Sequence, residues 1–359
     1  MRVLVVNAGS SSLKLRLLDE HDTVERSADL PASPDAAELD ILLDWAAPDV
    51  VGHRVVHGGT RFTGPVLITD PVREQLAALT DLAPLHQPKS LSALDAVSAR
   101  LPGIAAVASF DTAFHTTIPA AAATYAVPRE WRERYAIRRY GFHGLSHAYC
   151  SLRASVVLDR SAHGLRTVTC HLGAGASLAA VVDGRGVDTT MGFTPLEGLV
   201  MATRSGTVDP GMVLWLQEHE HLSPHDVATA LEQRSGLTGL AGTGDMRDVE
   251  AGAERGEPDA VLALDVYVHR LVAAIAAMTA SAGGLDVLAF TGGVGEHSPT
   301  VRRRATERLG FLGVDIDALR NDNADCDGDI SATGATVRTM VIAAREDLQI
   351  AAEARRLLR

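Results

Sequence analysis

Three turns of small residues each follow an apolar stretch of the sequence. "NAGSSS" follows Val3–Val6, "LGAGAS" follows the stretch that begins at Thr167, and "TGGVGEHS" follows Val287–Phe290. Backbone N–H groups in turns at strand ends are typical phosphate-binding groups. A single Gly/Ser-rich turn is more often only a tight turn, and none of the three matches a Walker A loop or a dinucleotide-binding fingerprint. Three such turns in one chain nevertheless favour a phosphorylated ligand.

Two arginines and an aspartate could act on an anionic ligand. Arg54 stands between apolar residues in "GHRVVHGG", so it needs an anionic partner, either an internal carboxylate or a bound anion. Asp111 follows the apolar stretch "IAAVASF", at a strand end where α/β proteins place ligands. Arg204 lies in the loop "MATRSGTVDPG", where an exposed surface arginine is the simpler alternative.

Two other patterns suggest metal sites and are rejected. His143 and His147 in "YGFHGLSH" have a helical spacing, but no Glu occupies the H-E-x-x-H position and no third ligand is near, so zinc is not predicted. In "NDNADCDGDI", a calcium loop starting at Asn323 would have Gly334 at its last ligand position, where Glu is needed. We interpret this segment as a solvated acidic loop, and Arg302–Arg304 as the solvent-facing side of a helix.

The first small-residue turn, "NAGSSS", is expected to join two strands. Arg2–Asn7 reads as a buried strand, and the alternation that starts at Leu13 indicates a second one. Lys14 therefore points away from the face that carries Leu13 and Leu15. It is one of only two lysines in the chain, the other being Lys89, among 33 basic residues.

The strand–turn–strand pattern returns after Thr167. Aligning Ser12 with Ser177 places the copies about 165 residues apart, a spacing of domain size. The third turn leads into a helix that should begin at Ser298–Pro299, a good cap and first-turn pair. Strands and helices alternate throughout, which indicates an α/β class with weak internal duplication. A C-terminal amphipathic helix is predicted from apolar residues at helical spacing, Ile350, Ala354, Leu357 and Leu358.

Composition narrows the function classes. The 359 residues favour about two domains. The net charge of −12 argues against a general nucleic-acid or anionic-membrane binder. Three widely spaced cysteines, Cys150, Cys170 and Cys326, are typical of reduced residues in a cytoplasmic protein. The apolar stretch at the start of the sequence is too short for a signal peptide. The uncharged stretch Leu271–Leu285 is shorter than a membrane span and is interpreted as a buried core helix.

Ten motifs, in order along the whole chain, resemble those of the acetate kinase family of short-chain carboxylate kinases. They are "VNAGSSSLK", "GHRVVHGG", "APLHQP", "FDTAFH", "YGFHGLSH", "HLGAGAS", "TPLEGLVMATRSGTVDPG", "GDMRD", "FTGGVGEHS" and "AREDLQIA". The resemblance implies the duplicated ribonuclease-H-like α/β fold shared with actin, heat-shock chaperones and sugar kinases, with a nucleotide cleft between two domains. Residues 1–115, completed by the helix 347–359, would form one domain and residues 116–346 the nucleotide-binding one.

The implied reaction is reversible phosphoryl transfer from MgATP to acetate, giving acetyl phosphate and ADP for acetyl-CoA synthesis. Propionate is the expected secondary substrate, because one methylene changes binding by only about 1–3 kcal/mol. Mg²⁺ is the implied metal, with Mn²⁺ as the alternative. The resemblance also implies a cytoplasmic homodimer, and no nucleic-acid or membrane partner is expected.

The resemblance assigns roles residue by residue. The implied catalytic set is Asp111, His143 and Arg204. Arg54 is the implied partner of the substrate carboxylate, and the pocket for its methyl group is formed by Val56, Leu85, Phe142 and Pro195. Asn7 and Glu346 are the implied magnesium-associated residues. The implied ATP contacts are Ser12, Lys14, His171, Leu172, Gly173, Ala174, Gly175, Asp245, Met246, Arg247, Gly293, Val294, Gly295, Glu296 and His297.

The sequence also departs from the family pattern. Gln87, Ala174 and His297 stand where the family usually has Asn, and Thr207 where it has Asp. The segment between the first hairpin and "GHRVVHGG" is shorter than usual. These departures leave the substrate range and the nucleotide preference open.

The residue types suit a transfer between two anions. Catalysis must position the reactants and neutralise charge, which two arginines, a histidine and Mg²⁺ can supply. Acetate is already nucleophilic at neutral pH, so Asp111 is interpreted as orienting Arg54 or a metal-bound water rather than as a base. Two alternatives remain: a longer-chain carboxylate kinase such as a butyrate kinase, and an actin- or chaperone-like ATPase. The second would have no use for Arg54, Arg204 and His143 around an acceptor.

Overall fold

Two compact units make up the chain. The structure is a computed structural model that describes residues 1–9, 12–32, 36–83, 87–325 and 327–359. Unit 1 consists of Met1–Thr116, Phe142–Tyr149 and Arg345–Arg359, and unit 2 of Thr117–Gly141 and Cys150–Ala344. The domain boundaries expected from the sequence stay a prediction. Unit 1 differs from the predicted first domain in also containing Thr116, Phe142–Tyr149, Arg345 and Glu346.

Unit 1 is built on a mixed sheet with the order β3-β2-β1-β4-β6-β5. Its strands are β1 (Val3–Ala8), β2 (Ser12–Leu18), β3 (Val24–Pro31), β4 (Val50–Val55), β5 (Val66–Leu67) and β6 (Ala105–Phe110). β1, β4 and β6 are parallel, whereas β2 and β3 run antiparallel as a meander from β1. Leu13 and Leu15 are buried and Lys14 is exposed, which confirms the predicted second strand and its orientation.

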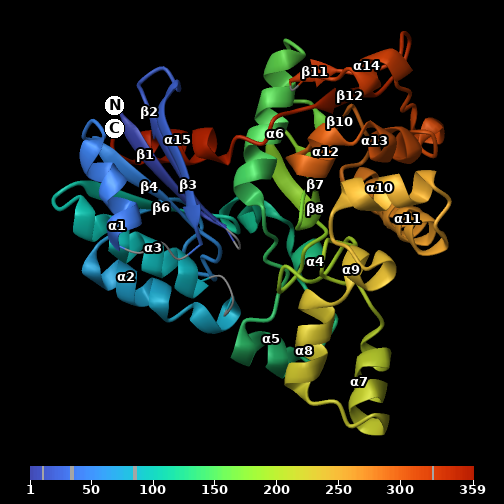
Figure 1. Cartoon of the computed structure of the whole chain (residues 1–359), viewed down its shortest axis with the longest axis horizontal. Helices are drawn as coiled ribbons and strands as arrows, with labels where there is room; N and C mark the ends of the chain where they lie inside the picture. The colour runs from blue at the N-terminus through green and yellow to red at the C-terminus, as the bar shows by residue number, and fades with distance from the viewer. Residues whose placement is uncertain (10–11, 33–35, 84–86, 326) are drawn as a thin grey trace. The chain divides into compact units, whose positions relative to one another are not determined.

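Helices cover both faces of this sheet, as Figure 1 shows. Those of unit 1 are α1 (Ala36–Leu39), α2 (Asp70–Ala77), α3 (Gln87–Arg100) and α15 (Glu346–Leu357), with 3₁₀ turns η1 (Asp40–Asp44), η2 (Thr80–Leu82) and η3 (Ala113–Thr117). On one face Val97 of α3 packs with Leu4 and Val6 of β1, and on the other Ile350 of α15 packs with Val3 and Val5. Alternating β1 residues thus enter two cores.

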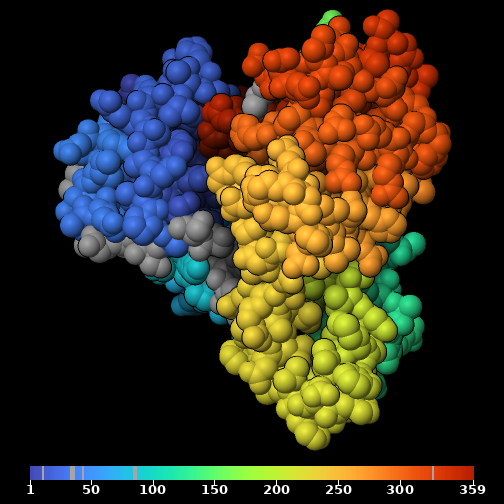
Figure 2. Space-filling view, turned by 45° about the vertical axis from the view of Figure 1, so that its right-hand side comes forward, coloured from blue at the N-terminus to red at the C-terminus, as the bar shows by residue number. Residues whose placement is uncertain are grey.

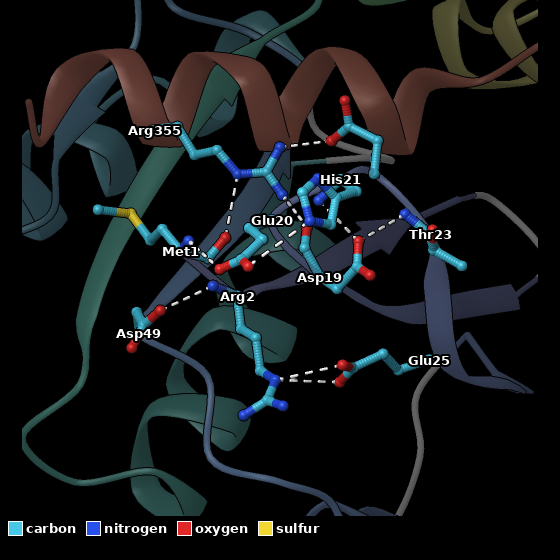
Figure 3. Close-up of polar contacts among 10 residues, drawn as sticks. Met1, Arg2, Asp19, Glu20, His21, Thr23, Glu25, Asp49 and Arg355 are labelled. Carbon is cyan, nitrogen blue, oxygen red and sulfur yellow. Dashed lines mark hydrogen bonds and ion pairs between the residues drawn. The ribbon is translucent and has the colours of Figure 1, made fainter.

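The C-terminal helix α15 is anchored to the beginning of the chain. Arg355 donates hydrogen bonds to the carbonyl oxygens of Met1 and Asp19 and forms an ion pair with Asp22 (Figure 3). Ile350 and Ala354 are buried, as the predicted amphipathic pattern requires, but Leu357 is 40% exposed because the helix ends there. These contacts matter for the site because α15 begins at Glu346.

Unit 2 repeats the architecture of unit 1. Its strands are β7 (Arg166–Leu172), β8 (Ala176–Val182), β9 (Arg185–Thr189), β10 (Val287–Thr291), β11 (Gly328–Asp329) and β12 (Arg338–Val341). The order is β11-β12-β10-β7-β8-β9, so β9-β8-β7-β10-β12 matches β3-β2-β1-β4-β6 in order and direction. The expected duplicated ribonuclease-H-like fold is confirmed.

The ladder register refines the alignment of the two copies. Lys14 faces Asn7 one pair before the end of the first hairpin, and Ser177 faces His171 at the same step of the second. Ser177 therefore corresponds to Lys14, and the expected alignment of Ser12 with Ser177 was wrong by two residues.

Helices surround the second sheet as well. They are α4 (Ala120–Ala123), α5 (Arg129–Tyr135), α7 (Pro210–His219), α8 (Pro224–Gln233), α9 (Gly236–Ala241), α10 (Met246–Glu254), α11 (Pro258–Ser281), α12 (Gly292–His297), α13 (Pro299–Thr306), α14 (Ala318–Asp322) and the 3₁₀ turn η4 (Gly310–Leu312), while α6 (Gly144–Val157) begins in unit 1 and ends here. The predicted start at Ser298–Pro299 is confirmed, since the Ser298 hydroxyl accepts the Val301 N–H at 2.9 Å.

Helix α11 is longer than the uncharged stretch suggested. It begins at Pro258 and has 24 residues, so by length and composition it could cross a membrane. Its buried residues recur at helical spacing, among them Leu264, Tyr267, Leu271 and Ile275, and the helix packs against β7 and β8. The buried face of α11 confirms the core helix that the sequence predicted.

Candidate active site

A bidentate ion pair lies at the centre of the candidate site in unit 1. Arg54 donates from Nε to Asp111 Oδ1 at 2.9 Å and from Nη2 to Asp111 Oδ2 at 2.6 Å. Its Nη1 donates to Asn7 Oδ1 at 3.1 Å and lies 3.8 Å from Glu346 Oε2. Asn7 Nδ2 in turn donates to that same Glu346 oxygen at 2.8 Å. Four of the predicted site residues are thus joined by direct polar contacts.

The parallel strands explain why these residues meet. Asn7 lies near the end of β1, Arg54 near the end of β4, and Asp111 directly after β6. Because the carboxyl ends of parallel strands meet at one edge of a sheet, side chains there share one site. Glu346 reaches the same edge as the first residue of α15.

The Arg54–Asp111 pair is largely buried. Asp111 is 1% exposed and the Arg54 side chain 15%. Burial lowers the pKa of Arg54, but the Asp111 and Glu346 carboxylates outweigh that effect and raise the pKa above its usual value. Burial raises the pKa of Asp111, and the charge and hydrogen bonds of Arg54 counteract that rise. Charge-assisted bidentate bonding holds both groups in one orientation. Asp111 therefore orients Arg54, as one of the sequence interpretations proposed.

His143 is placed beside Asp111 by the residue that follows it. The N–H of Gly144 donates to the Asp111 carbonyl at 2.8 Å, and a Cβ at position 144 would lie 2.2 Å from that oxygen. Only glycine permits this approach. His143 itself is half-buried and has a φ of 55°, the left-handed region that non-glycine residues rarely adopt. Such an outlier is typical of residues that a site holds in a required position.

Two of the residues predicted for the apolar pocket are buried in unit 1. Val56 and Phe142 are buried, and the His57 ring meets the edge of Phe142 at 5.6 Å between centroids. Leu85, which was also assigned to the pocket, lies outside the described residues. Pro195 belongs to unit 2, where it is only half-buried.

Arg204 is fixed within unit 2 by one of the predicted pocket residues. Its Nη1 donates to the Pro195 carbonyl at 2.7 Å. Burial lowers the pKa of Arg204, and the Glu232 carboxylate opposes this effect. The side chain is half-buried, so the surface-arginine alternative is wrong.

Two of the small-residue turns come together in unit 2. His171–Gly175 closes the β7–β8 hairpin, where the Gly173 N–H donates to the Gly175 carbonyl at 3.0 Å. Helix α12 follows β10 directly, and at Gly292, with a φ of 79°, a Cβ would lie 2.8 Å from the Leu172 carbonyl. The Ala174 carbonyl accepts the Ala202 N–H at 3.0 Å, which links this hairpin to the Arg204 segment. The predicted phosphate loops thus lie beside each other.

The remaining predicted nucleotide residues lie outside these two turns, and Met246 among them is buried. Asp245 caps α10 by accepting the Arg247 N–H at 3.0 Å, and the Arg247 side chain pairs with the same carboxylate. The side-chain bond from Arg247 lowers the pKa of Asp245 to about 2. Lys14 stands opposite Asp29 of β3 and Asn7 of β1. Ser12 begins β2, and part of its turn, residues 10–11, lies outside the described residues.

The two residues predicted to be associated with magnesium, Asn7 and Glu346, are joined by a hydrogen bond. Among the described residues, no group of three or more His, Cys, Asp or Glu side chains could hold a metal ion. Mg²⁺ in kinases is bound through one or two carboxylates together with waters and substrate phosphates. The Glu346 carboxylate and the Asn7 amide oxygen fit that chemistry.

Sequence reasoning missed several residues that shape the site. Glu197 accepts hydrogen bonds from Tyr125 and, at 2.7 Å, from Arg139, and the Tyr125 hydroxyl accepts the Phe193 N–H. This cluster fixes the loop that contains Pro195. Glu197 lies in the motif "TPLEGL", and that motif was the only available signal.

Comparison with known proteins gives a consistent result. A family model, the acetokinase family, matches residues 36–352. Acetate kinase from Trichormus variabilis is 49% identical over 311 residues, covering 86% of this chain and 76% of that protein. The crystal structure of Porphyromonas gingivalis acetate kinase has a TM-score of 0.92 at 34% identity, with 100% of both chains covered. A propionate kinase from Francisella tularensis has a TM-score of 0.91 at 35% identity, covering 99% of each chain. The chain therefore belongs to the acetokinase family.

Proposed function

We propose that the chain catalyses reversible phosphoryl transfer from MgATP to acetate, giving acetyl phosphate and ADP. The carrying observation is the buried Arg54–Asp111 pair at the carboxyl ends of β4 and β6, in a chain of the acetokinase family. The bonds to Asp111 and Asn7 do not use every N–H group of the Arg54 guanidinium. The others can pair with a substrate carboxylate.

The side chains around Arg54 would select and orient the acceptor. Val56 and Phe142 offer an apolar wall for the methyl group, and Asp111 prevents the guanidinium from rotating. A carboxylate held in this way keeps an oxygen directed at the phosphorus, which is the positioning contribution to catalysis. His143 and Arg204 are proposed to stabilise the negative charge on the transferred group.

ATP is proposed to bind through unit 2. The backbone N–H groups of His171–Gly175 and Gly293–His297 would contact phosphates, and Asp245–Arg247 would contact the rest of the nucleotide, with Ser12 and Lys14 contributing from unit 1. Gly293 supports this assignment, because no described atom lies within 4 Å of where its Cβ would be. Asn7 and Glu346 would hold Mg²⁺, with Mn²⁺ as the alternative, and the metal would neutralise phosphate charge when bound.

Propionate is the proposed secondary substrate. The structural likeness to a propionate kinase supports it, and an apolar pocket discriminates one methylene only weakly. The kcat/KM values for formate, acetate, propionate and butyrate measure this range directly. A maximum at butyrate would instead favour the longer-chain kinase alternative.

The assembly and location are also proposals. A homodimer is supported by helix α7, whose Met212, Leu214 and Trp215 side chains are 41%, 58% and 50% exposed. This segment of the chain has the yellow-green colour in Figure 2. Sedimentation analysis tests it. A cytoplasmic location is supported by Cys150 and Cys170, which are buried free thiols. A role in acetyl-CoA synthesis is proposed from the match to the acetokinase family.

A trapping assay tests the central proposal. Protein, MgATP and acetate are mixed with hydroxylamine, which converts acetyl phosphate to acetohydroxamate. Acetate-dependent hydroxamate is expected. ATP hydrolysis without any acetate-dependent product would contradict the proposal and favour the chaperone-like ATPase alternative.

A further inference from the structure

Arg302 lies in an unexpected environment. The run Arg302–Arg304 was predicted to face solvent, but Arg302 is 2% exposed. Successive residues of a helix are about 100° apart, so three in a row cannot share one face. Arg303 and Arg304 do lie outside, where they pair with Glu307 and Asp265. Arg302 shares the buried side of α13 with Val301 and Thr306.

The buried guanidinium joins two segments. Its Nε donates to Asn321 Oδ1 at 2.9 Å and its Nη2 to the Asn321 carbonyl at 2.7 Å. Its Nη1 donates to the carbonyls of Gly295 and Glu296 at 2.9 and 2.8 Å. Asn321 belongs to the segment interpreted as a solvated acidic loop, yet it is fully buried and its Nδ2 donates to the Pro299 carbonyl. The interpretation was wrong for this residue.

These contacts fix the C-terminal end of α12. The last carbonyls of any helix have no partner within the helix, and α12 is short enough for such groups to be a large part of it. Arg302 supplies donors to two of them. The beginning of α12 is fixed separately, by the close approach of Gly292 to Leu172. Both ends of the small-residue turn after β10 are therefore held.

A second contact links α12 to α10. The Ser298 hydroxyl, directly after α12, donates to Glu250 of α10. Burial raises the pKa of Glu250, and the bond from Ser298 and the charge of Arg302 oppose the rise. Helix α10 begins at Met246 and is capped by Asp245. Arg302 therefore holds α12, and the Ser298–Glu250 bond connects α12 to α10. These are the two segments that are proposed to hold the nucleotide, and Figure 1 shows them as adjacent orange and yellow helices.

We propose that Arg302 is a positioning residue for the nucleotide: anchored on Asn321, it holds the Gly295 and Glu296 carbonyls, and with Ser298 and Glu250 it keeps α12 in register with α10. Arg302 does not touch the ligand in this proposal. It rests on the proposed function in which these segments bind ATP. A planar fork of donors suits a group that must hold two segments at once, whereas a single ammonium does not.

The test compares Arg302→Met and Arg302→Lys with wild type. We expect KM for ATP and the dissociation constant for MgADP, measured by calorimetry, to rise about 10- to 100-fold in Arg302→Met, by analogy with the loss of residues that orient the ligands of a metal site. KM for acetate should stay within about twofold, because Arg54 belongs to unit 1. Arg302→Lys keeps the charge but not the fork, so it should restore only part of the MgADP affinity.

Two further variants extend the test, the first as a control and the second as an independent probe of the link to α10. Arg303→Met removes the neighbouring arginine of the same helix, whose pairing is exposed, and should leave both constants unchanged. Glu250→Ala removes the link to α10 from a half-buried position, and we expect KM for ATP to rise by about 3- to 10-fold, the effect of one charged hydrogen bond of roughly 1 kcal/mol.

The outcomes separate the possible roles. If the role of Arg302 were purely structural, its replacement would lower the melting temperature and the fraction of active enzyme. The apparent kcat would then fall, but the MgADP affinity of the folded enzyme would not change. Folded Arg302→Met with wild-type MgADP affinity would overturn the proposal. If Arg302→Met does not fold, wild-type affinity in Glu250→Ala and Arg302→Lys would overturn it instead. If only the proposed function were wrong, the wild-type protein would bind MgADP but would form no hydroxamate.

Discussion

Gln87 forms hydrogen bonds with both the N–H and the carbonyl group of His57. Its Oε1 accepts the His57 N–H at 3.3 Å, and its Nε2 donates to the carbonyls of His57 at 3.3 Å and Leu76 at 3.2 Å. Gln87 is fully buried at the start of α3, and His57 directly follows Val56 of the proposed methyl pocket. The residue noted as a departure from the family pattern therefore fixes the backbone next to Val56 of the proposed methyl pocket.

Replacing Gln87 should weaken acetate binding more than ATP binding. Gln87→Leu has a similar size but leaves the His57 N–H and carbonyl without these partners, which costs about 1–3 kcal/mol of folding free energy. We expect a lower unfolding midpoint in urea and a KM for acetate raised about 10-fold, a change of roughly 1.4 kcal/mol. KM for ATP should not change. An equal rise in both KM values would show that Gln87 does not act on the acetate pocket.

Arg54 should combine a stability role with a substrate role. Arg54→Met leaves the Asp111 carboxylate buried without its partner, which typically costs about 3–5 kcal/mol. The double variant Arg54→Met/Asp111→Asn removes both charges and should recover most of that loss in urea unfolding. Acetate-dependent activity should stay lost in both. If the double variant regained activity, the guanidinium would not be the group that binds the substrate carboxylate.

Arg204 should act on turnover rather than on nucleotide binding. Arg204→Ala removes a half-buried cation that the Pro195 carbonyl holds in place. We expect kcat to fall by roughly 10²- to 10⁵-fold, the range for a lost charge-stabilising donor or arginine finger. Calorimetry should still detect MgADP binding. Arg234→Ala, in the same unit, is the control. An unchanged kcat in Arg204→Ala would remove this residue from the catalytic set.

The sequence predicted those parts that depend on short-range patterns. The alternation around Lys14 identified β2, and the apolar stretches before Arg54 and Asp111 identified the strand ends at which the site lies. The duplicated topology followed from two similar hairpins, although their turns differ in length by one residue and the expected alignment was wrong by two. Such features depend on neighbours in the chain, which a sequence displays directly.

Burial of polar side chains could not be predicted in the same way. Arg302 meets Asn321, 19 residues later, and Tyr125 meets Glu197, 72 residues later. Neither spacing follows a helical or strand period, so only the folded chain shows that these groups have partners. An arginine beside two others on a helix was expected to be solvated because unpaired burial is costly. The carbonyls of α12 supply the pairing that the sequence could not show.

Stability should fall as the pH decreases from 6.5 toward 4. Burial lowers the pKa of His53, His57 and His115 to about 4 each, so these rings are neutral in the folded protein. The unfolded chain binds protons on them near pH 6.5, which favours unfolding over this window by up to roughly 3 kcal/mol for each ring. Carboxylates with lowered pKa values, such as Asp245, contribute only near and below pH 4.

Urea unfolding at about pH 7.5, 6.5, 5.5 and 4.5 measures this dependence. The free energy of unfolding should change little between the first two values and fall steeply between the last two. His163→Gln removes an exposed histidine and should leave the slope unchanged. A flat profile down to pH 4.5 would show that the buried rings are already protonated or become solvated without cost.

Lys14 provides the last test, because the chain otherwise uses arginine almost everywhere. It is exposed on β2, faces Asn7 across the hairpin, and stands opposite Asp29. A compact ammonium beside a phosphate is not equivalent to a wide guanidinium. We expect Lys14→Arg to raise KM for ATP by about 3- to 10-fold, the equivalent of a charged hydrogen bond of roughly 1 kcal/mol. Lys89→Arg, which changes the other lysine, should have no such effect. Identical kinetics in both variants would mean that Lys14 is only a surface residue.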